Sequence, residues 1–374
     1  MNILIEISEL FIKKKAGIPT VISEIVKRIT NYNKTIKCCF SGFSFSQSNL
    51  ENFEKSFPQQ VEFKIRKFPN KLINYCIKYF LPIEVLTNSK FDVAFFPGSS
   101  LFFSKRKSVA IIHDIALRVN PKWNKFHYTK NILLQWKYIL PKLTFIITPS
   151  FSTKNDLIKF YNIPEKKIKV IPLGVDHNLF CSINPSEINP EVKKYKNFIL
   201  YVGTLEPRKN IVAIIKSFEK IKSRGWEGNL LLIGKKGWLF KEIIEVYNQS
   251  KYKDNIYFLD YVEKDVLPHF YNSAKLFIYP SLYEGFGLPV LEAMACGCPV
   301  ITSKVSSLPE VVGDTAILVD PYNEDEITNA IERILSDENL RRKMSKKGAE
   351  RAELFSWDKC VQEILQVLKN IASA

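Results

Sequence analysis

The sequence lacks the features that mark membrane-spanning and secreted proteins. No apolar run reaches the roughly 18 residues that a membrane-spanning helix needs, and the most apolar segment, residues 132–148, is interrupted by two lysines and a proline. The first residues, 1–7, have no basic stretch and contain Glu6, so they do not fit a signal peptide. The chain is therefore predicted to be a cytoplasmic protein that begins with a buried strand.

Paired metal ligands are missing as well. The chain has seven cysteines, an odd number, and their spacing does not match that of zinc sites. Cys38 and Cys39 are adjacent, and Cys296 and Cys298 flank a glycine. We interpret the cysteines as reduced thiols of a cytosolic protein, and we expect no zinc site.

Acidic residues are scarce in the first half only. Residues 1–170 contain 28 Lys and Arg against 11 Asp and Glu, whereas residues 171–374 contain 26 against 27. This asymmetry indicates an anionic partner for the first half, either a membrane surface, a nucleic acid or a phosphorylated acceptor. A general bias towards lysine is the alternative. Nucleic acid is disfavoured because the aromatic residues are spread through the strand and helix patterns, not gathered among the basic residues.

In the second half, short apolar runs alternate with helical stretches. Continuous apolar runs are typical of strands buried on both faces, and the alternation predicts six strand–helix units of a doubly wound parallel sheet. The predicted strands are residues 198–203, 229–234, 255–260, 276–281, 299–303 and 316–320. The predicted helices are residues 209–225, 239–250, 263–274, 287–296 and 323–336.

The first half has a similar but less regular pattern, with its clearest helix at residues 19–30. Its predicted strands are residues 3–7, 35–40, 61–68, 93–96, 109–114, 145–149 and 168–171. A polar connection around residues 176–196 separates the halves. We therefore predict an α/β protein with Rossmann-like domains at residues 1–175 and 196–355. A last helix, within residues 356–374, can pack back on the N-terminal domain.

The segment Tyr279–Ala293 combines a strand end, a glycine-containing turn and the start of a helix. Ligands of open α/β sheets bind at the carboxyl ends of the strands. Gly285 and Gly287 let backbone N–H groups approach a ligand, and a helix N-terminus favours a phosphate. Glu284 and Glu292 stand at two depths and could bind hydroxyls of two sugars, a transferred sugar and a nucleotide ribose. The alternative is a capping carboxylate followed by an exposed helix residue.

The segment Glu206–Asn210 follows the first strand of the second half. Arg208 and Lys209 stand at a predicted helix start, where the helix dipole disfavours cations. A bound anion would offset that cost, because Arg binds phosphate bidentately and Lys acts as a point charge. A solvated basic pair is the alternative.

Two further candidates lie in the first half. His113 is placed near the end of the predicted strand 109–114, and Gly17 is placed in the turn before the helix at residues 19–30. Both positions are at the carboxyl edge of the predicted sheet, where ligands bind. An ordinary core histidine and an ordinary turn glycine are the alternatives.

Together these segments resemble the retaining GT-B glycosyltransferases of glycosyltransferase family 4. The resemblance covers nearly the whole chain and is most specific between residues 145 and 320. The segments that carry it are Glu284–Glu292, Glu206–Asn210, Ile171–Asp176 and Thr148–Ser152. It implies two Rossmann-like doubly wound domains facing across a cleft, with the donor bound mainly by the second domain and the acceptor by the first.

The resemblance also implies roles for individual residues. Glu284 and His113 are the implied catalytic residues: Glu284 contacts the donor sugar, and His113 approaches that sugar from the first domain. Glu292 contacts the ribose, and Arg208 and Lys209 contact the diphosphate. The other implied donor-binding residues are Gly17, Tyr261, Val262, Gly285, Phe286, Gly287 and Leu288.

Two positions depart from the family pattern near the phosphates. Ala16 stands where many members have a second glycine, and Thr204 stands where some have arginine. Metal-dependent sugar transferases of the other main fold hold their cation with an Asp-x-Asp pair, which this chain lacks. We therefore expect no metal or other cofactor, with Arg208 and Lys209 stabilising the leaving group instead.

The implied function is retaining transfer of a hexose from a nucleotide sugar to a saccharide or lipid-linked acceptor in bacterial surface polysaccharide assembly. GDP-mannose is the first candidate donor, because Glu-Pro-Arg-Lys-Asn is frequent in bacterial mannosyltransferases, and UDP- and dTDP-sugars stay open. A nucleotide-sugar epimerase of the same fold is the alternative enzyme. A basic nucleic-acid- or membrane-binding protein without catalysis is the alternative from another class.

An apolar stripe at helical spacing within residues 72–81, beside Lys71 and Lys78, fits contact with a membrane. Such contact would place the protein peripherally on the inner face of the cell membrane. A helix packed on its own core is the other interpretation.

Overall fold

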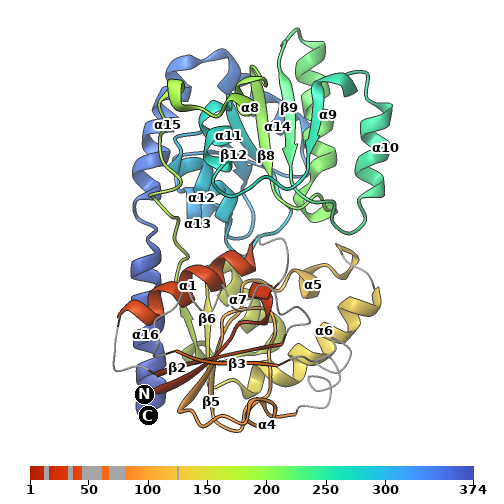
Figure 1. The fold of residues 1–374 in the computed structure, drawn as a ribbon. Coiled ribbons are helices and arrows are strands. Elements are labelled where there is room, and N and C mark those ends of the chain that lie inside the picture. The colour runs from red at the N-terminus through yellow and green to blue at the C-terminus, as the bar shows by residue number, and fades with distance from the viewer. Residues whose placement is uncertain (12–16, 33–36, 44–60, 67–80, 124–125) are drawn as a thin grey trace. The chain divides into compact units, whose positions relative to one another are not determined.

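The computed structural model describes residues 1–374 except for residues 12–16, 33–36, 44–60, 67–80 and 124–125. The described chain forms two compact units, each built on a parallel β-sheet with helices packed against it (Figure 1). Unit 1 consists of Met1–Arg118, His127–Gly174 and Trp357–Ala374, and unit 2 consists of Val119–Phe126 and Val175–Ser356.

The sheet of unit 1 has seven strands in the order β3-β2-β1-β4-β5-β6-β7. The strands are β1 (Asn2–Glu6), β2 (Lys37–Phe43), β3 (Glu62–Arg66), β4 (Val93–Phe96), β5 (Lys107–Ile111), β6 (Phe145–Thr148) and β7 (Ile168–Val170). All neighbouring pairs are parallel. The strand order reverses between β1 and β4, which is where doubly wound sheets bind ligands.

The sheet of unit 2 has six parallel strands in the order β10-β9-β8-β11-β12-β13. The strands are β8 (Phe198–Val202), β9 (Asn229–Ile233), β10 (Ile256–Leu259), β11 (Leu276–Tyr279), β12 (Val300–Ser303) and β13 (Ile317–Val319). Here the order reverses between β8 and β11, so the loops that follow these two strands flank the switch point.

The α-helices of unit 1 are α1 (Ile18–Tyr32), α4 (Ile83–Thr87), α5 (Ala116–Val119), α6 (Phe126–Ile139), α7 (Phe151–Tyr161) and α16 (Trp357–Ser373). Those of unit 2 are α8 (Pro190–Lys193), α9 (Ile211–Ser223), α10 (Lys241–Gln249), α11 (Leu267–Ser273), α12 (Leu288–Ala295), α13 (Leu308–Val312), α14 (Glu324–Ser336) and α15 (Glu338–Ala352). In unit 2, α9 packs with α10 and α14, and α12 packs with α11 and α15.

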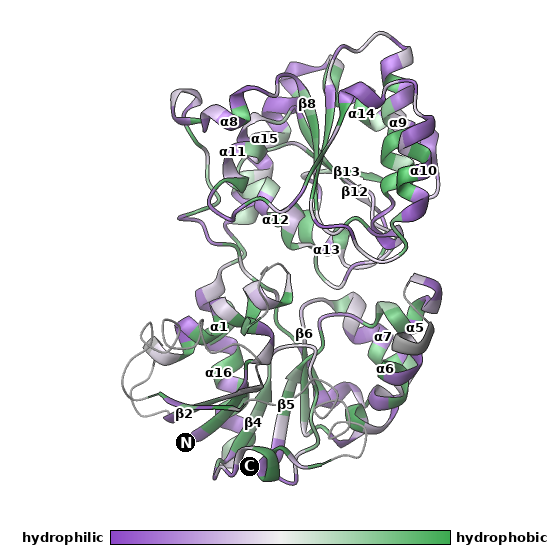
Figure 2. Cartoon of the chain, turned by 45° about the vertical axis from the view of Figure 1, so that its right-hand side comes forward, coloured by the Kyte–Doolittle hydropathy of each residue, from purple (hydrophilic) through white to green (hydrophobic). Residues whose placement is uncertain are grey.

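The central strands form the cores of the units. Every residue of β4, β8, β11 and β12 is buried, as continuous apolar strands require when helices cover both faces. Figure 2 shows the same division, with hydrophobic residues along the strands and hydrophilic residues on the outer faces of the helices. Among the described residues, no helix combines the length and the hydropathy that crossing a membrane requires.

Two segments belong to a different unit from the residues next to them in the chain. Helix α16 follows unit 2 but belongs to unit 1, where it packs on α1 and where Asp358 accepts a hydrogen bond from Arg28 at 3.0 Å. Conversely, Val119–Phe126 clusters with unit 2, and the ring of Trp123 lies 6.2 Å from that of Tyr283. The predicted N-terminal domain, residues 1–175, includes this short segment.

Several predicted element boundaries differ from those observed, for local reasons. Strand β5 ends at Ile111, so His113 follows the strand instead of ending it. Strand β11 ends at Tyr279, because Pro280 has no N–H to continue the ladder. Helix α9 begins at Ile211 and not at residue 209. The apolar stripe within residues 72–81 lies, apart from its last residue, outside the described residues.

The carboxyl end of β1 contains a buried acid. Glu6 is fully buried, and its Oε2 has no hydrogen-bond partner among the described residues. Burial raises the pKa of this carboxyl from 4.5 to about 8. The folded protein therefore keeps the Glu6 proton between these values, whereas the unfolded chain releases it. The free energy of unfolding consequently falls as the pH rises through this range.

We expect Glu6→Gln to stabilise the protein at pH 8, because glutamine mimics the protonated acid without a proton to lose. The gain should shrink towards pH 5 by about 1.4 kcal/mol per pH unit. Thermal unfolding of both proteins at pH 5, 6, 7 and 8 measures this difference. A gain that is the same at every pH would contradict the assignment of a proton to Glu6.

Candidate active site

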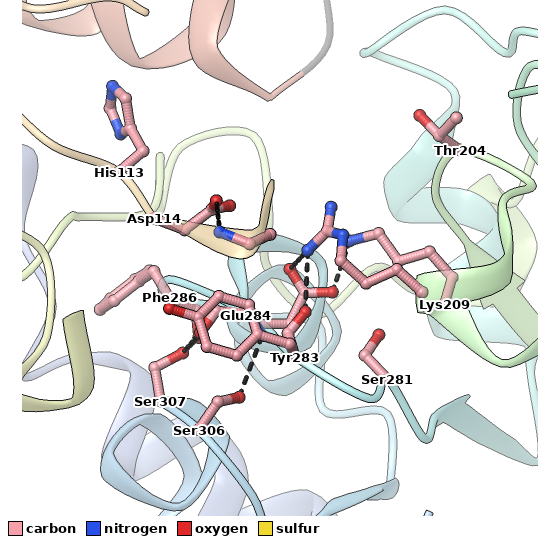
Figure 3. Close-up of polar contacts among 12 residues, drawn as sticks. His113, Asp114, Thr204, Lys209, Ser281, Tyr283, Glu284, Phe286, Ser306 and Ser307 are labelled. Atoms are coloured by element: carbon pink, nitrogen blue, oxygen red, sulfur yellow. Dashed lines mark hydrogen bonds and ion pairs between the residues drawn. The ribbon is translucent and has the colours of Figure 1, made fainter. Parts of the chain in front are cut away.

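The turns after β8 and β11 bring two cations and two carboxylates into contact in unit 2. The Nζ atom of Lys209 lies 2.5 Å from Oε1 of Glu284, and a guanidinium nitrogen of Arg208 lies 3.2 Å from Oε2 of the same carboxylate. Arg208 also contacts Oε1 of Glu206 at 2.9 Å and donates to the carbonyl oxygen of Tyr283 at 2.8 Å. Figure 3 shows the carboxylate of Glu284 turned towards Lys209.

The two turns are joined by hydrogen bonds that fix this arrangement. Pro207–Lys209 form a 3-10 turn, which Asn210 ends with a φ of 61°. The Asn210 amide donates to the carbonyl oxygen of Pro280 at 3.1 Å, and the N–H of Leu282 donates to the carbonyl oxygen of Arg208 at 2.8 Å. The cations and the carboxylate are therefore held together although about 75 residues separate them in the chain.

Arg208 and Lys209 do not stand at the start of a helix, contrary to the prediction from the sequence. Arg208 and Lys209 precede α9 in a separate turn, and they are already paired with Glu206 and Glu284. A solvated basic pair is also wrong, because Lys209 is only 7% exposed. The cations are instead part of a compact group whose formal charges balance.

For both Lys209 and Glu284, burial and ion pairing have opposite effects on the pKa. Burial lowers the pKa of Lys209, with a smaller contribution from Arg208, while Glu284 opposes the shift. Burial alone would raise the pKa of Glu284, but Lys209 and Arg208 outweigh it and hold that pKa well below its usual range. Because the charged groups are in direct contact, we infer that the pair is ionised at neutral pH.

The ammonium of Lys209 retains a donor for a ligand. Two of its three N–H groups have acceptors, Oε1 of Glu284 at 2.5 Å and the hydroxyl of Tyr279 at 2.6 Å. No third acceptor contacts Nζ among the residues that the structure describes. The third N–H group can therefore bind an anion.

The turn that precedes α12 is held by two serines from the loop after β12. The Ser306 hydroxyl accepts from the N–H of Glu284 at 3.0 Å, and the Ser307 hydroxyl lies 2.9 and 2.8 Å from the carbonyl oxygens of Glu284 and Phe286 (Figure 3). Gly287 caps α12 with a φ of 122°, and a side chain there would meet Leu308 at 2.8 Å. Only glycine fits this cap, which sets the N-terminus of α12 beside Glu284.

Further along this region, the predicted residues Gly285, Phe286 and Leu288 complete the turn and begin the helix. Gly285 and Phe286 are buried, and Leu288 is the first residue of α12. The peptide groups here are at the positive end of the helix, where backbone N–H groups without intrahelical partners favour an anion.

Glu292 lies on α12, one residue past the first turn of the helix, and is partly buried. Its Oε2 accepts a hydrogen bond from the hydroxyl of Tyr271 at 3.1 Å. Burial raises the pKa of this carboxyl to about 7, against the opposing effects of Tyr271 and Lys264. The alternative of an exposed helix residue is therefore wrong.

Tyr261 and Val262 follow β10 at the same carboxyl edge of the unit 2 sheet, and both are partly buried. The Nζ atom of Lys235, from the loop after β9, lies 5.3 Å from the centre of the Tyr261 ring. This contact is a cation–π interaction between neighbouring loops. It places an aromatic ring at the carboxyl edge of the unit 2 sheet, beside the ends of β9 and β10.

The remaining predicted residues belong to unit 1. His113, in the loop after β5, places Nε2 2.8 Å from the carbonyl oxygen of Pro97. Burial lowers the pKa of His113, so the ring is neutral at pH 7, with Nε2 donating and Nδ1 left as the acceptor. Gly17 has a φ of 63°, is exposed, and accepts from the N–H of Thr20 at 3.0 Å at the start of α1.

Sequence reasoning missed four residues of the unit 2 cluster. Glu206 lies in the segment Glu206–Asn210 but has no predicted role, and Tyr279 is predicted only as a strand residue. Ser306 and Ser307 follow β12, so the rule that ligands bind at carboxyl strand ends could have pointed to them. Within the described ranges, no group of three or more His, Cys, Asp or Glu side chains is arranged to hold a metal ion.

Comparison with known families gives two matches that together cover most of the chain. Residues 185–351 match the family described as glycosyl transferases group 1. Residues 44–179 match glycosyltransferase family 4. The first match contains the whole cluster around Glu284, and the second contains His113.

Individual relatives agree with these families. The chain is 32% identical over 268 residues to O-antigen chain mannosyltransferase B of Escherichia coli, which covers 70% of each chain. It is 27% identical over 269 residues to the O-antigen chain mannosyltransferase RfbU of Salmonella typhimurium, again covering 70% of each. Among solved structures, Anabaena HepE in complex with UDP and glucose has a TM-score of 0.78 at 19% identity, covering 99% of this chain and all of that one. The chain belongs to glycosyltransferase family 4 and is a glycosyltransferase with the GT-B fold.

Proposed function

We propose that this enzyme transfers a hexose from a nucleotide sugar to a saccharide or lipid-linked acceptor in the assembly of a surface polysaccharide. The contact of Lys209 and Arg208 with Glu284, beside the N-terminus of α12, is the observation that carries the proposal. Similarity to two O-antigen mannosyltransferases supports the acceptor class.

In this proposal the donor diphosphate binds the cations and the helix N-terminus. Lys209 offers its third N–H group, Arg208 offers the positive charge of its guanidinium, and Gly285–Leu288 offer backbone N–H groups. Negative charge grows on the diphosphate as the bond to the sugar breaks, and these fixed groups stabilise it without a metal ion. Activity that is unchanged by an excess of EDTA is expected, and dependence on added Mg²⁺ or Mn²⁺ would contradict this part.

Donor binding also changes the partners of Glu284. The diphosphate competes with this carboxylate for Lys209 and Arg208, so the carboxylate becomes available to accept hydrogen bonds from the donor sugar. Glu292 gains the ribose hydroxyls that compensate its burial. Tyr261 and Val262, which follow β10 at the carboxyl edge of the unit 2 sheet, contact the base of the nucleotide.

We propose that His113 and Gly17 also contact the donor. The neutral His113 ring approaches the sugar, and Gly17 approaches the phosphate. The bond from C1 to the phosphate oxygen loosens through an oxocarbenium-like state. The acceptor hydroxyl then attacks from the leaving-group side, so the anomeric configuration is retained. The anomer of the product, determined by NMR, tests retention, and an inverted linkage would refute it.

GDP-mannose is our first candidate donor, because both O-antigen relatives are named mannosyltransferases. A UDP-sugar is the competing candidate, since the HepE structure contains UDP. Thermal unfolding with GDP, UDP and dTDP separates them, because a bound ligand raises Tm by mass action. The largest rise is expected with GDP, and a larger rise with UDP would reassign the donor.

A peripheral membrane location is a separate proposal, supported by α6. Leu134 is 50% exposed and Tyr138 is 46% exposed, and both share a face of the helix with the exposed Lys130. Exposed apolar side chains beside a lysine fit an anionic bilayer surface. We expect co-sedimentation with phosphatidylglycerol vesicles at low salt that Leu134→Glu weakens. The control Leu354→Glu, at an exposed leucine of unit 2, should bind normally, and no sedimentation of the unaltered protein would refute the proposal.

A further inference from the structure

Tyr279, the last residue of β11, contacts the proposed phosphate-binding lysine. Its hydroxyl lies 2.6 Å from Nζ of Lys209, and its ring is fully buried. The ring stacks with that of Tyr201, whose centre is 5.7 Å away at an interplanar angle of 15°, and with that of Phe277, at 5.7 Å and 19°. The hydroxyl is therefore fixed in position by the core of unit 2.

Lys209 needs such a fixed contact because its side chain is long and flexible. An ammonium on four rotatable carbons is held in one place only by its hydrogen-bond acceptors. It has two acceptors here, the hydroxyl of Tyr279 and the carboxylate of Glu284. In the proposed reaction Glu284 turns to the donor sugar, which leaves Tyr279 as the acceptor that does not change.

The hydroxyl also suits this role chemically. Burial and the neighbouring Glu284 carboxylate raise the pKa of Tyr279 well above its ordinary value of 10, so the hydroxyl stays neutral. A neutral acceptor holds the ammonium without cancelling its charge. Lys209 can thus be oriented by Tyr279 and still act with its full charge on a phosphate.

We propose that Tyr279 is a positioning residue that holds the ammonium of Lys209 in the orientation that binds the donor diphosphate. This inference rests on the proposed function, in which Lys209 contacts that diphosphate. It goes beyond it by assigning the orientation of the lysine to one buried hydroxyl.

Tyr279→Phe tests the proposal, because it removes the hydroxyl and keeps the stacked ring. Tyr201→Phe is the matched control: its hydroxyl belongs to the same stack but donates to the carbonyl oxygen of Thr204 at 3.0 Å. The probes are GDP, or UDP if that stabilises the protein more, and the corresponding nucleoside. Calorimetry gives the affinities, and Tm and circular dichroism check the fold.

We expect Tyr279→Phe to weaken diphosphate binding by about tenfold, the effect of one hydrogen bond to a charged group. Nucleoside affinity should stay unchanged, and Tyr201→Phe should bind both probes normally. In a Lys209→Met background, adding Tyr279→Phe should not lower the diphosphate affinity further. This comparison keeps the test decisive if Tyr279→Phe alone loses stability. Equal effects of both tyrosine variants, or normal diphosphate affinity in Tyr279→Phe, would overturn this inference alone. No binding of any diphosphate to the unaltered protein would instead overturn the proposed function on which it rests.

Discussion

Replacing Lys209 with methionine is expected to lower kcat/KM for the donor by at least about 1,000-fold. Methionine keeps the length of the buried side chain but removes the charge that faces the diphosphate, and the loss of one preorganised donor at a developing anion costs about 100- to 1,000-fold in other enzymes. The loss of ground-state binding to the diphosphate adds to this effect. Steady-state kinetics with varied donor concentration measures it, and activity within tenfold of normal would contradict the assignment of Lys209.

Folding must be separated from catalysis in this experiment. Lys209→Met leaves Glu284 buried with Arg208 as its main charged partner, and breaking a buried ion pair from one side costs about 3–5 kcal/mol in stability. The double variant Lys209→Met with Glu284→Gln removes both charges and should recover most of that stability. Its activity should stay as low as that of Lys209→Met, because the diphosphate still lacks its cation.

Glu284→Gln alone is expected to reduce kcat by roughly 100-fold or more while leaving nucleoside diphosphate binding intact or tighter. The carboxylate has two roles in the proposal: it pairs with Lys209 and Arg208, and it accepts hydrogen bonds from the donor sugar as the bond to C1 breaks. GDP has no transferred hexose that could lose its contact with Glu284, and in the variant it no longer competes with a carboxylate for the cations. Calorimetry with GDP beside turnover with the full donor separates these roles.

Other combinations of kcat and GDP affinity in Glu284→Gln would change the role that we assign to this carboxylate. Near-normal kcat would remove Glu284 from the reacting sugar and leave it as a structural partner of the cations. Weaker GDP binding with normal kcat would mean that the carboxylate mainly orients Lys209 and Arg208. Stability should also be followed, since the variant leaves Lys209 buried without its direct counter-charge.

The strands, their parallel arrangement and the edge that bears the candidate site follow from local patterns in the sequence. Fully apolar runs such as Phe198–Val202 and Leu276–Tyr279 identify strands that are buried on both faces, and their alternation with helices indicates a parallel sheet. The carboxyl ends of these strands then place Glu284 and Lys209 at one edge. The glycine cap at Gly287 is also a local feature, because its backbone angle excludes other residues.

The pairing of the charges could not be predicted in the same way. Whether a lysine faces solvent, a ligand or a carboxylate 75 positions away depends on how two loops approach, and a single sequence does not record that distance. The predicted start of α9 at residue 209 is wrong, so the helix dipole does not support anion binding at Arg208 and Lys209. Glu6 illustrates the same limit, because the buried strand predicted at residues 3–7 does not indicate that one oxygen of the Glu6 carboxyl has no hydrogen-bond partner among the described residues.

A crystal structure of the protein with a bound nucleoside diphosphate tests the central claim most directly. We predict that a terminal phosphate lies within about 3 Å, the usual hydrogen-bond distance, of Nζ of Lys209 and of the backbone N–H groups at the start of α12. We also predict the ribose beside Glu292 and the hydroxyl of Tyr279 still in contact with Lys209. A diphosphate bound away from these groups, with Lys209 in contact with Glu284 and Tyr279 alone, would contradict this claim.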